Sequence, residues 1–237
     1  EDREILKGIG LNLPAGSFVS LVGESGCGKS TIAGILAAKN RGYNGEITIG
    51  GVPLNEVNET NLMRRVVLVR HNSYLFKGTV EENLKMAKPD ATKEEMETVL
   101  QKVNLLGFLQ TQDGLQTQLL EKASNLSGGQ CQRLVIARAL LRADSAVYIF
   151  DEAASNIDVE SEELIMNVIH ELAKTKTVLL ISHRLANVVK SDKIYFLKDG
   201  EIKESGKHEE LMSQNGAYRH LYESQMALEN YGKGGVA

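Results

Sequence analysis

The stretch LVGESGCGKST, residues 21–31, decides how this chain folds. It overlaps the apolar residues 18–22 and runs into a second apolar segment, residues 32–38. The first segment is short and stops at Gly23, which predicts a buried strand. The second segment belongs to a predicted helix over residues 30–39. A glycine-rich loop is therefore expected to join a strand to a helix.

This loop matches the pattern G-x-x-x-x-G-K-[ST] at every fixed position. Glycines allow successive N–H groups to point inward, and the N-terminus of the following helix attracts anions. The matching stretch is predicted to bind the phosphates of a nucleoside triphosphate through Gly23, Ser25, Gly26, Cys27, Gly28, Lys29, Ser30 and Thr31. Lys29 would neutralise the β- and γ-phosphates, Ser30 would bind Mg²⁺, and Thr31 would donate to the α-phosphate. The alternative is a glycine-rich turn with a solvated lysine.

Two carboxylates follow the strand predicted over residues 146–150, namely Asp151 and Glu152. Asp151 would hold Mg²⁺ through water, and Glu152 would act as the general base that polarises the attacking water. The alternative is that the pair forms a helix N-cap and a first-turn acid. The presence of Lys29 upstream favours phosphate-transfer chemistry.

His183 follows the strand predicted over residues 177–182. Its position corresponds to the edge of the sheet at which open parallel sheets carry their ligands. We therefore predict that His183 contacts the γ-phosphate. A purely structural histidine is the alternative.

The rest of the chain predicts an α/β fold. Strands over residues 18–22, 66–69, 146–150 and 177–182 alternate with helices over residues 30–39, 130–142 and 159–173. This alternation is typical of a parallel sheet with helical crossovers. Residues 45–51 predict a strand of a small antiparallel layer, and residues 79–120 predict a helical insertion. Asp199-Gly200 predicts a hairpin turn.

Composition excludes several classes of function. The chain has 237 residues, a net charge of -4 and a pI near 5.8, which argues against nucleic acid as a partner. No apolar run approaches the roughly 20 residues that span a bilayer. Two cysteines are too few for a disulfide scaffold, so we expect a reducing, cytosolic setting.

The stretch NLSGGQCQR, residues 125–133, resembles the signature sequence of ATP-binding cassette (ABC) proteins. The phosphate loop, the signature, Asp151-Glu152 and His183 occur in the order typical of that family. The resemblance implies a P-loop NTPase fold with a parallel-sheet core, a small antiparallel β layer and an inserted helical lobe. It implies one nucleotide-binding domain over residues 1–237, with residues 1–71 and 138–237 as the core and 72–137 as the helical lobe.

The same resemblance implies a head-to-tail dimer. Each ATP would lie between the phosphate loop of one chain and the signature of a second nucleotide-binding domain, identical or not. The signature residues are Ser127, Gly128, Gly129 and Gln130. Glycines at a helix start can bind an anion, although alone they indicate only a helix cap. The stretch SNID, residues 155–158, resembles the D-loop that crosses this interface, and Asp158 matches it.

Further stretches resemble the exporter branch of the family. These are TQLLEKASNLSGGQ (117–130), LFKGTVEENL (75–84) and GKHEEL (206–211). Leu120 and Ala123 replace two usual glycines, so the first match is partial. The resemblance implies a transmembrane domain as partner and a location at the cytoplasmic face of the cell membrane. The chain itself is expected to be an excised or C-terminal domain that lacks this partner and the adenine-stacking aromatic.

His71 departs from the family pattern, which usually has glutamine at this position. That glutamine contacts Mg²⁺ and the attacking water, and a neutral imidazole can replace it as a ligand. We therefore predict that His71 alters the rate or pH dependence of hydrolysis. A tolerated loop residue is the alternative. The family resemblance implies a domain that binds and hydrolyses ATP to power transport across a membrane. Two other functions compete with this one: a soluble ABC ATPase outside transport, and a small-molecule kinase in which the signature would have no role.

Overall fold

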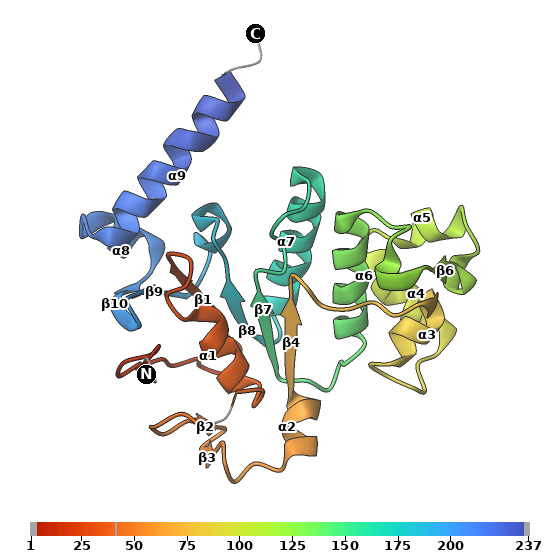
Figure 1. Ribbon diagram of the computed structural model, residues 1–237, viewed down its shortest axis with the longest axis horizontal. Helices are drawn as coiled ribbons and strands as arrows, with labels where there is room; N and C mark the ends of the chain where they lie inside the picture. Colours follow the sequence, from red (N-terminus) through yellow and green to blue (C-terminus); the bar gives the residue numbers. More distant parts are fainter. Residues whose placement is uncertain (1–3, 41, 235–237) are drawn as a thin grey trace.

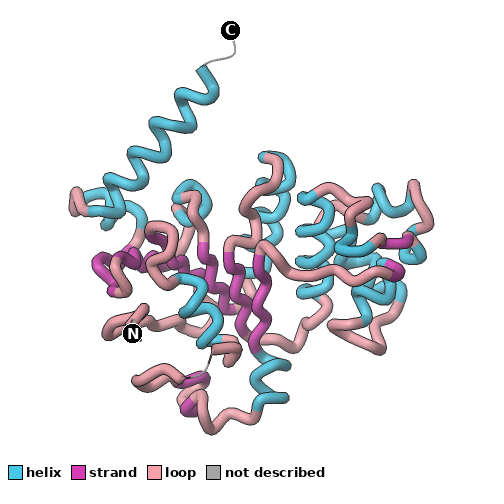
Figure 2. Tube along the Cα trace, in the orientation of Figure 1, coloured by secondary structure: helices cyan, strands magenta, loops and turns pink. Residues whose placement is uncertain are grey.

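The computed structural model describes residues 4–40 and 42–234 and contains a twisted six-stranded sheet at its centre (Figures 1 and 2). The strand order is β10-β9-β1-β8-β7-β4, and every neighbouring pair is parallel except β9 and β10. The strands are β1 (Phe18–Gly23), β4 (Val66–Arg70), β7 (Val147–Asp151), β8 (Thr177–Ile181), β9 (Lys193–Lys198) and β10 (Glu201–Gly206). The predicted parallel-sheet core is confirmed.

Helices cover both faces of the sheet, because alternate residues of each central strand point to opposite sides. Val19 and Leu21 of β1 pack in one apolar core with Ile32 of α1. Val22 of the same strand belongs to the other core, together with Ile165 of α7. The helices are α1 (Lys29–Leu36), α2 (Glu59–Arg65), α3 (Val80–Lys85), α4 (Lys93–Lys102), α5 (Leu106–Gln110), α6 (Gly128–Leu140), α7 (Val159–Ala173), α8 (His208–Ser213) and α9 (Ala217–Gly234).

The helices α3, α4 and α5 gather with α6 beside the edge strand β4, away from α1 (Figure 1). A two-residue antiparallel pairing of β5 (Gly78–Thr79), which precedes α3, with β6 (Gln118–Leu119), which follows α5, joins the two ends of this helical segment. Thr79 and Thr92 start α3 and α4 as capping boxes. No helix within residues 4–40 and 42–234 combines the length and the apolar composition needed to cross a bilayer.

Several element boundaries differ from the prediction. The strand expected over residues 45–51 is only β2 (Thr48–Ile49), which pairs antiparallel with β3 (Val52–Pro53). Gly50 and Gly51 both have positive φ, so they form the turn between β2 and β3 rather than extending the strand. The helix α1 ends at Leu36, because Ala38 adopts a left-handed conformation with φ 52°. By contrast, α7 matches its predicted range.

Candidate functional site

The phosphate loop connects β1 to α1 and encloses the ammonium group of Lys29. Lys29 is 4% exposed, and its Nζ donates to the carbonyl oxygens of Gly23 and Glu24 at 2.9 and 2.8 Å. The alternative of a solvated lysine is therefore wrong. A Cβ at Gly23 would collide with the carbonyl oxygen of Leu197, which explains the glycine there. Gly28 adopts φ 111° and ends the loop as the N-cap of α1.

Ser30 and Asp151 meet at the carboxyl end of the sheet. The Ser30 Oγ donates to Asp151 Oδ1 at 2.9 Å, although 121 positions separate the two residues. The Asp151 side chain is only 4% exposed, and Arg70 Nε lies 3.6 Å from its Oδ2. Burial raises the pKa of the Asp151 carboxyl, and the Ser30 hydrogen bond opposes that rise. A hydroxyl and a desolvated carboxylate thus face the phosphate loop.

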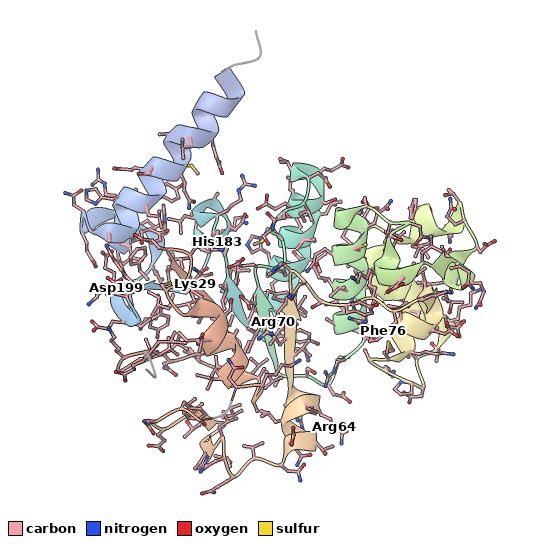
Figure 3. The ribbon with its side chains drawn as sticks, viewed as in Figure 1. Lys29, Arg64, Arg70, Phe76, His183 and Asp199 are labelled. Carbon is pink, nitrogen blue, oxygen red and sulfur yellow. The ribbon has the colours of Figure 1, made fainter. Side chains whose placement is uncertain are left out.

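Glu152 and His183 form the second contact at this edge. The Nε2 of His183 lies 2.5 Å from Oε1 of Glu152. The Glu152 N–H donates to the carbonyl of Ile181, so the residues after β7 and β8 are held together. The alternative that Asp151-Glu152 caps a helix is wrong, because α7 begins only at Val159 with Asp158 as its N-cap. Figure 3 shows Lys29, Arg70 and His183, which come from α1, β4 and the loop after β8.

The signature residues form a separate group at the start of α6. Ser127 Oγ accepts from the Gln130 N–H at 3.1 Å, and Gln130 Oε1 accepts from the Ser127 N–H at 2.9 Å. This capping box is the helix cap that the stretch indicated when taken alone. Ser127 and Gly128 are exposed, whereas Gly129 is buried.

Asp158 lies next to this signature group. A Cβ built on Gly129 would come within 2.9 Å of Asp158 Oδ2. Asp158 itself is exposed, and its Oδ1 accepts from the Ser161 N–H at 2.8 Å. That hydrogen bond lowers the pKa of the Asp158 carboxyl. In Figure 1 the helices α6 and α7, which start at this group, lie to the right of α1, which follows the phosphate loop.

The remaining predicted residues lie on or beside the phosphate loop. His71 follows β4, is exposed, and donates its backbone N–H to the carbonyl of Asp151 at 3.2 Å. Ser25 and Gly26 are exposed, and Thr31 is half-buried in α1. Cys27 Sγ lies 3.8 Å from Lys29 Nζ. The roles assigned to these side chains stay predictions.

Three residues near the site were not predicted from the sequence. Arg70 contacts Asp151, and Gln132 of α6 donates from Nε2 to the Arg70 carbonyl at 3.3 Å. Gln225 of α9 donates to the carbonyl of His183 at 2.6 Å. The sequence indicated Arg70 and Gln132 only through their positions: Arg70 directly precedes His71, and Gln132 closely follows the signature. Nothing in the local sequence of α9 indicated Gln225.

Comparison with known proteins decides the family. The family model described as "ABC transporter" matches residues 6–155. The chain belongs to this family. The phosphate loop, the signature and Asp151-Glu152 all lie within the matched residues. The ABC match confirms the predicted family and fold.

Similar proteins agree with this assignment. An uncharacterized ABC transporter ATP-binding protein of Haemophilus influenzae is 46% identical over 229 residues, covering 97% of this chain and 41% of that protein. An ATP-dependent lipid A-core flippase of Vibrio vulnificus is 40% identical over 226 residues, covering 94% of this chain and 39% of the flippase. A solved bacterial Atm1-family ABC exporter with ATP bound aligns with a TM-score of 0.89 at 33% identity, covering 94% of this chain and 39% of the exporter. The ABC chain thus spans about two fifths of the length of these relatives.

Proposed function

We propose that this ABC domain hydrolyses ATP with Mg²⁺ at an interface between two nucleotide-binding domains and thereby powers an exporter. The observation that carries the proposal is the convergence of Lys29, Ser30-Asp151 and Glu152-His183 at one edge of the sheet. Phosphoryl transfer requires a cation for the phosphates, a metal site and a group that orients water. Each requirement has a residue at this edge.

The donor set at Ser30 and Asp151 fits Mg²⁺. This cation usually keeps several waters and binds one or two protein oxygens together with substrate phosphates. Accordingly, residues 4–40 and 42–234 contain no cluster of three or more His, Cys, Asp or Glu that could form an all-protein cage. Mg²⁺ bound here would neutralise phosphate charge. His71 is the third predicted ligand, because it stands where the family usually has glutamine. Its backbone N–H is hydrogen-bonded to the carbonyl of Asp151.

Catalysis would rest on positioning and electrostatics. Lys29, already desolvated, would hold the β- and γ-phosphates. Glu152 would accept a proton from the attacking water, and His183 would contact the γ-phosphate. Their short contact would keep both side chains on the same side of the substrate.

The signature would act on the nucleotide of a second domain. Ser127, Gly128 and Asp158 are exposed and lie at the starts of α6 and α7, not at the start of α1, which follows the phosphate loop of their own chain. A head-to-tail pair would bring them to the partner's loop, and the chemistry would occur only in that pair. An identical chain and a related chain are both compatible with this arrangement.

The exporter assignment rests on the relatives. They include a protein named as a flippase and one described as an exporter, so we propose a transmembrane domain as partner at the cytoplasmic face of the membrane. Residues 72–137 would form a helical lobe that contacts this partner, and residues 1–71 and 138–237 would form the catalytic core. Tyr74, Phe76 and Leu120 are at least 43% exposed, which supports a contact there. The soluble, non-transport alternative is not favoured, and family membership argues against a small-molecule kinase.

The Glu152→Gln variant tests this proposal. It keeps the shape of the side chain but removes the base, so we expect ATP hydrolysis to fall by about 10²-fold or more. The variant should also accumulate as an ATP-bound dimer in size-exclusion chromatography, whereas the wild-type chain stays monomeric after turnover. Glu223→Gln on the exposed part of α9 is the matched control. Unchanged hydrolysis in Glu152→Gln, or transfer of phosphate to an acceptor other than water, would contradict the proposal.

A further inference from the structure

The loop that carries His183 is held by one side chain of the C-terminal helix α9. Gln225 donates from Nε2 to the carbonyl of His183 at 2.6 Å. Its Oε1 accepts from the N–H of Leu185 at 2.9 Å. A single amide thus satisfies one acceptor and one donor of the backbone over residues 183–185. The position of His183 therefore depends on a residue 42 positions later in the chain.

Arg184, between these two backbone contacts, ties the same loop to two helices. Its guanidinium pairs with Glu162 of α7 and with Glu229 of α9, the latter at 2.8 Å. Glu162 is buried and also accepts from the Asn187 side chain at 2.8 Å. Charge-assisted hydrogen bonds of this kind are stronger than neutral ones. The loop is consequently fixed to α7 and α9 at once.

The start of α9 is itself anchored to the core. The carboxylate of Glu204 on β10 accepts from the N–H groups of Ala217 and Tyr218 at 2.5 and 3.2 Å. Tyr218 is fully buried, and its hydroxyl lies 2.8 Å from His208 Nδ1. Gln225 lies about two turns further along the helix. Because the first turn of α9 is fixed, Gln225 can be held in a defined position. Further along, α9 extends away from the rest of the molecule (Figure 1).

We propose that Gln225 is a positioning residue for ATP hydrolysis, because it sets the backbone from which His183 reaches Glu152. This inference rests on the proposed function of His183 and Glu152. Catalytic side chains must be held within about 0.5 Å of their productive geometry by supporting hydrogen bonds. The 2.5 Å contact between His183 and Glu152 depends on where residue 183 lies. In the described part of the chain the side chain of Gln225 forms hydrogen bonds to the backbone of His183 and Leu185 and none to the phosphate loop or Glu152, so it would act through His183.

The first test compares Gln225→Ala with two further variants of α9 in the 237-residue chain. We expect Gln225→Ala to lower kcat about tenfold and to leave the KM for ATP within about twofold, because only the transition state needs His183 in place. Gln225→Glu keeps the acceptor for Leu185 but loses the donor to His183, so its kcat should lie between those of the wild type and Gln225→Ala. Ser224→Ala is the matched control, because its Oγ donates to the His220 carbonyl within α9 and, among the described residues, to no group of the loop that carries His183. Its kcat should equal that of the wild type.

The second test is spectroscopic and needs no hydrolysis. The chain has five histidines, so the ring resonance of His183 can be identified by NMR with a His183→Gln variant. In the nucleotide-free chain, Gln225→Ala should shift and broaden that resonance, whereas Ser224→Ala should not. A reduced kcat with an unmoved His183 resonance would overturn the inference, because α9 would then act through stability alone. An unchanged kcat would overturn it as well. A wild-type chain without Glu152-dependent hydrolysis would refute the proposed function, and the resonance would still decide whether Gln225 holds His183.

Discussion

The imidazole of His183 contacts the carboxylate of Glu152 at 2.5 Å, although the two residues follow different strands. Glu152 adopts φ 55°, a left-handed conformation that is uncommon outside glycine. Its N–H donates to Ile181 at 3.0 Å, and its carbonyl accepts from the Ser155 hydroxyl at 2.8 Å. Such strain persists only where the surrounding structure enforces it, and it clusters at functional sites. The backbone after β7 is therefore shaped to present Glu152 to His183.

Removing the imidazole should affect turnover more than binding. We expect His183→Ala to lower kcat for ATP hydrolysis by about 10²-fold, because removing one positioned group that stabilises the charge of the transition state typically costs this much. The affinity for ATP, measured with a fluorescent analogue, should change little, since Lys29 and the phosphate loop remain intact. His220→Ala, on the exposed part of α9, is the control. A kcat for His183→Ala within a factor of about two of the wild type would exclude a catalytic role.

The two glycines of the signature should respond differently to alanine. A methyl group on Gly129 would collide with Ser161 and come within 2.9 Å of Asp158 Oδ2, so α6 would have to move away from α7. We expect Gly129→Ala to lower the free energy of unfolding by about 1–3 kcal/mol. On Gly128 the nearest atom is Ile157 Cγ2 at 3.9 Å, which leaves room for a methyl group. Gly128→Ala should therefore fold like the wild type.

The Gly128→Ala and Gly129→Ala variants distinguish an effect on packing within the domain from an effect on dimerisation. In the Glu152→Gln background, Gly128→Ala should lose the ATP-dependent dimer, because Gly128 is exposed where the partner's phosphate would bind. Thermal unfolding and size-exclusion chromatography with ATP measure the two effects. A stable Gly128→Ala variant that still forms the dimer would contradict the head-to-tail arrangement.

His71 is predicted to change how hydrolysis depends on pH. Its backbone N–H binds the Asp151 carbonyl, so the imidazole starts beside the proposed metal site. A neutral imidazole can bind a metal or water, whereas a protonated one cannot. We expect the kcat of His71→Gln to exceed that of the wild type, and the ratio of the two to change with pH, because the amide oxygen of glutamine stays available as a ligand at every pH. A ratio that stays near one from about pH 5.5 to 8 would mean that His71 is a tolerated loop residue.

The sequence predicted the sheet because several of its parallel strands are short apolar segments, each followed by a glycine or by a polar residue of the phosphate-transfer motifs. It also predicted α7 well, since Asp158 caps the helix and Ile165 and Ile169 lie on its buried stripe. The antiparallel layer was predicted too long, because Gly50 and Gly51 turn the chain after two residues of β2. A glycine can end a strand or continue it, and the tertiary contacts determine which of the two occurs.

Contacts between distant parts of the chain could not be predicted in the same way. Asp151, Glu152 and His183 were located by their positions at strand ends, yet the direct contact of Glu152 with His183 depends on a strained backbone. Gln225 had no motif around it, and the only signal for Arg70 was that it directly precedes His71. Their role follows from the order of strands and the path of α9, which emerge only from the packed structure.

Stability in mild acid should depend on His170, at the end of α7. Its ring packs edge-on against Phe18 at 5.4 Å, and its Nε2 is buried with no hydrogen-bond partner within residues 4–40 and 42–234. Burial lowers the pKa of His170 below the usual value for histidine, and the charge of Lys190 lowers it further. Below about pH 6.5 the unfolded chain therefore binds more protons than the folded chain at this group, so the free energy of unfolding falls as the pH falls.

The His170→Phe variant isolates this contribution, because phenylalanine keeps the aromatic contact with Phe18 but cannot titrate. We expect the slope of unfolding free energy against pH between about pH 5 and 6.5 to decrease in the variant, by at most about 1.4 kcal/mol per pH unit. Urea unfolding at several pH values measures the slope, and His220→Phe on α9 serves as the control. The absolute stability of the variant is not informative here, since a different ring also changes packing. Equal slopes for His170→Phe and the wild type would show that protonation of His170 does not destabilise the folded chain. We do not expect this result, because the ring of His170 packs against Phe18.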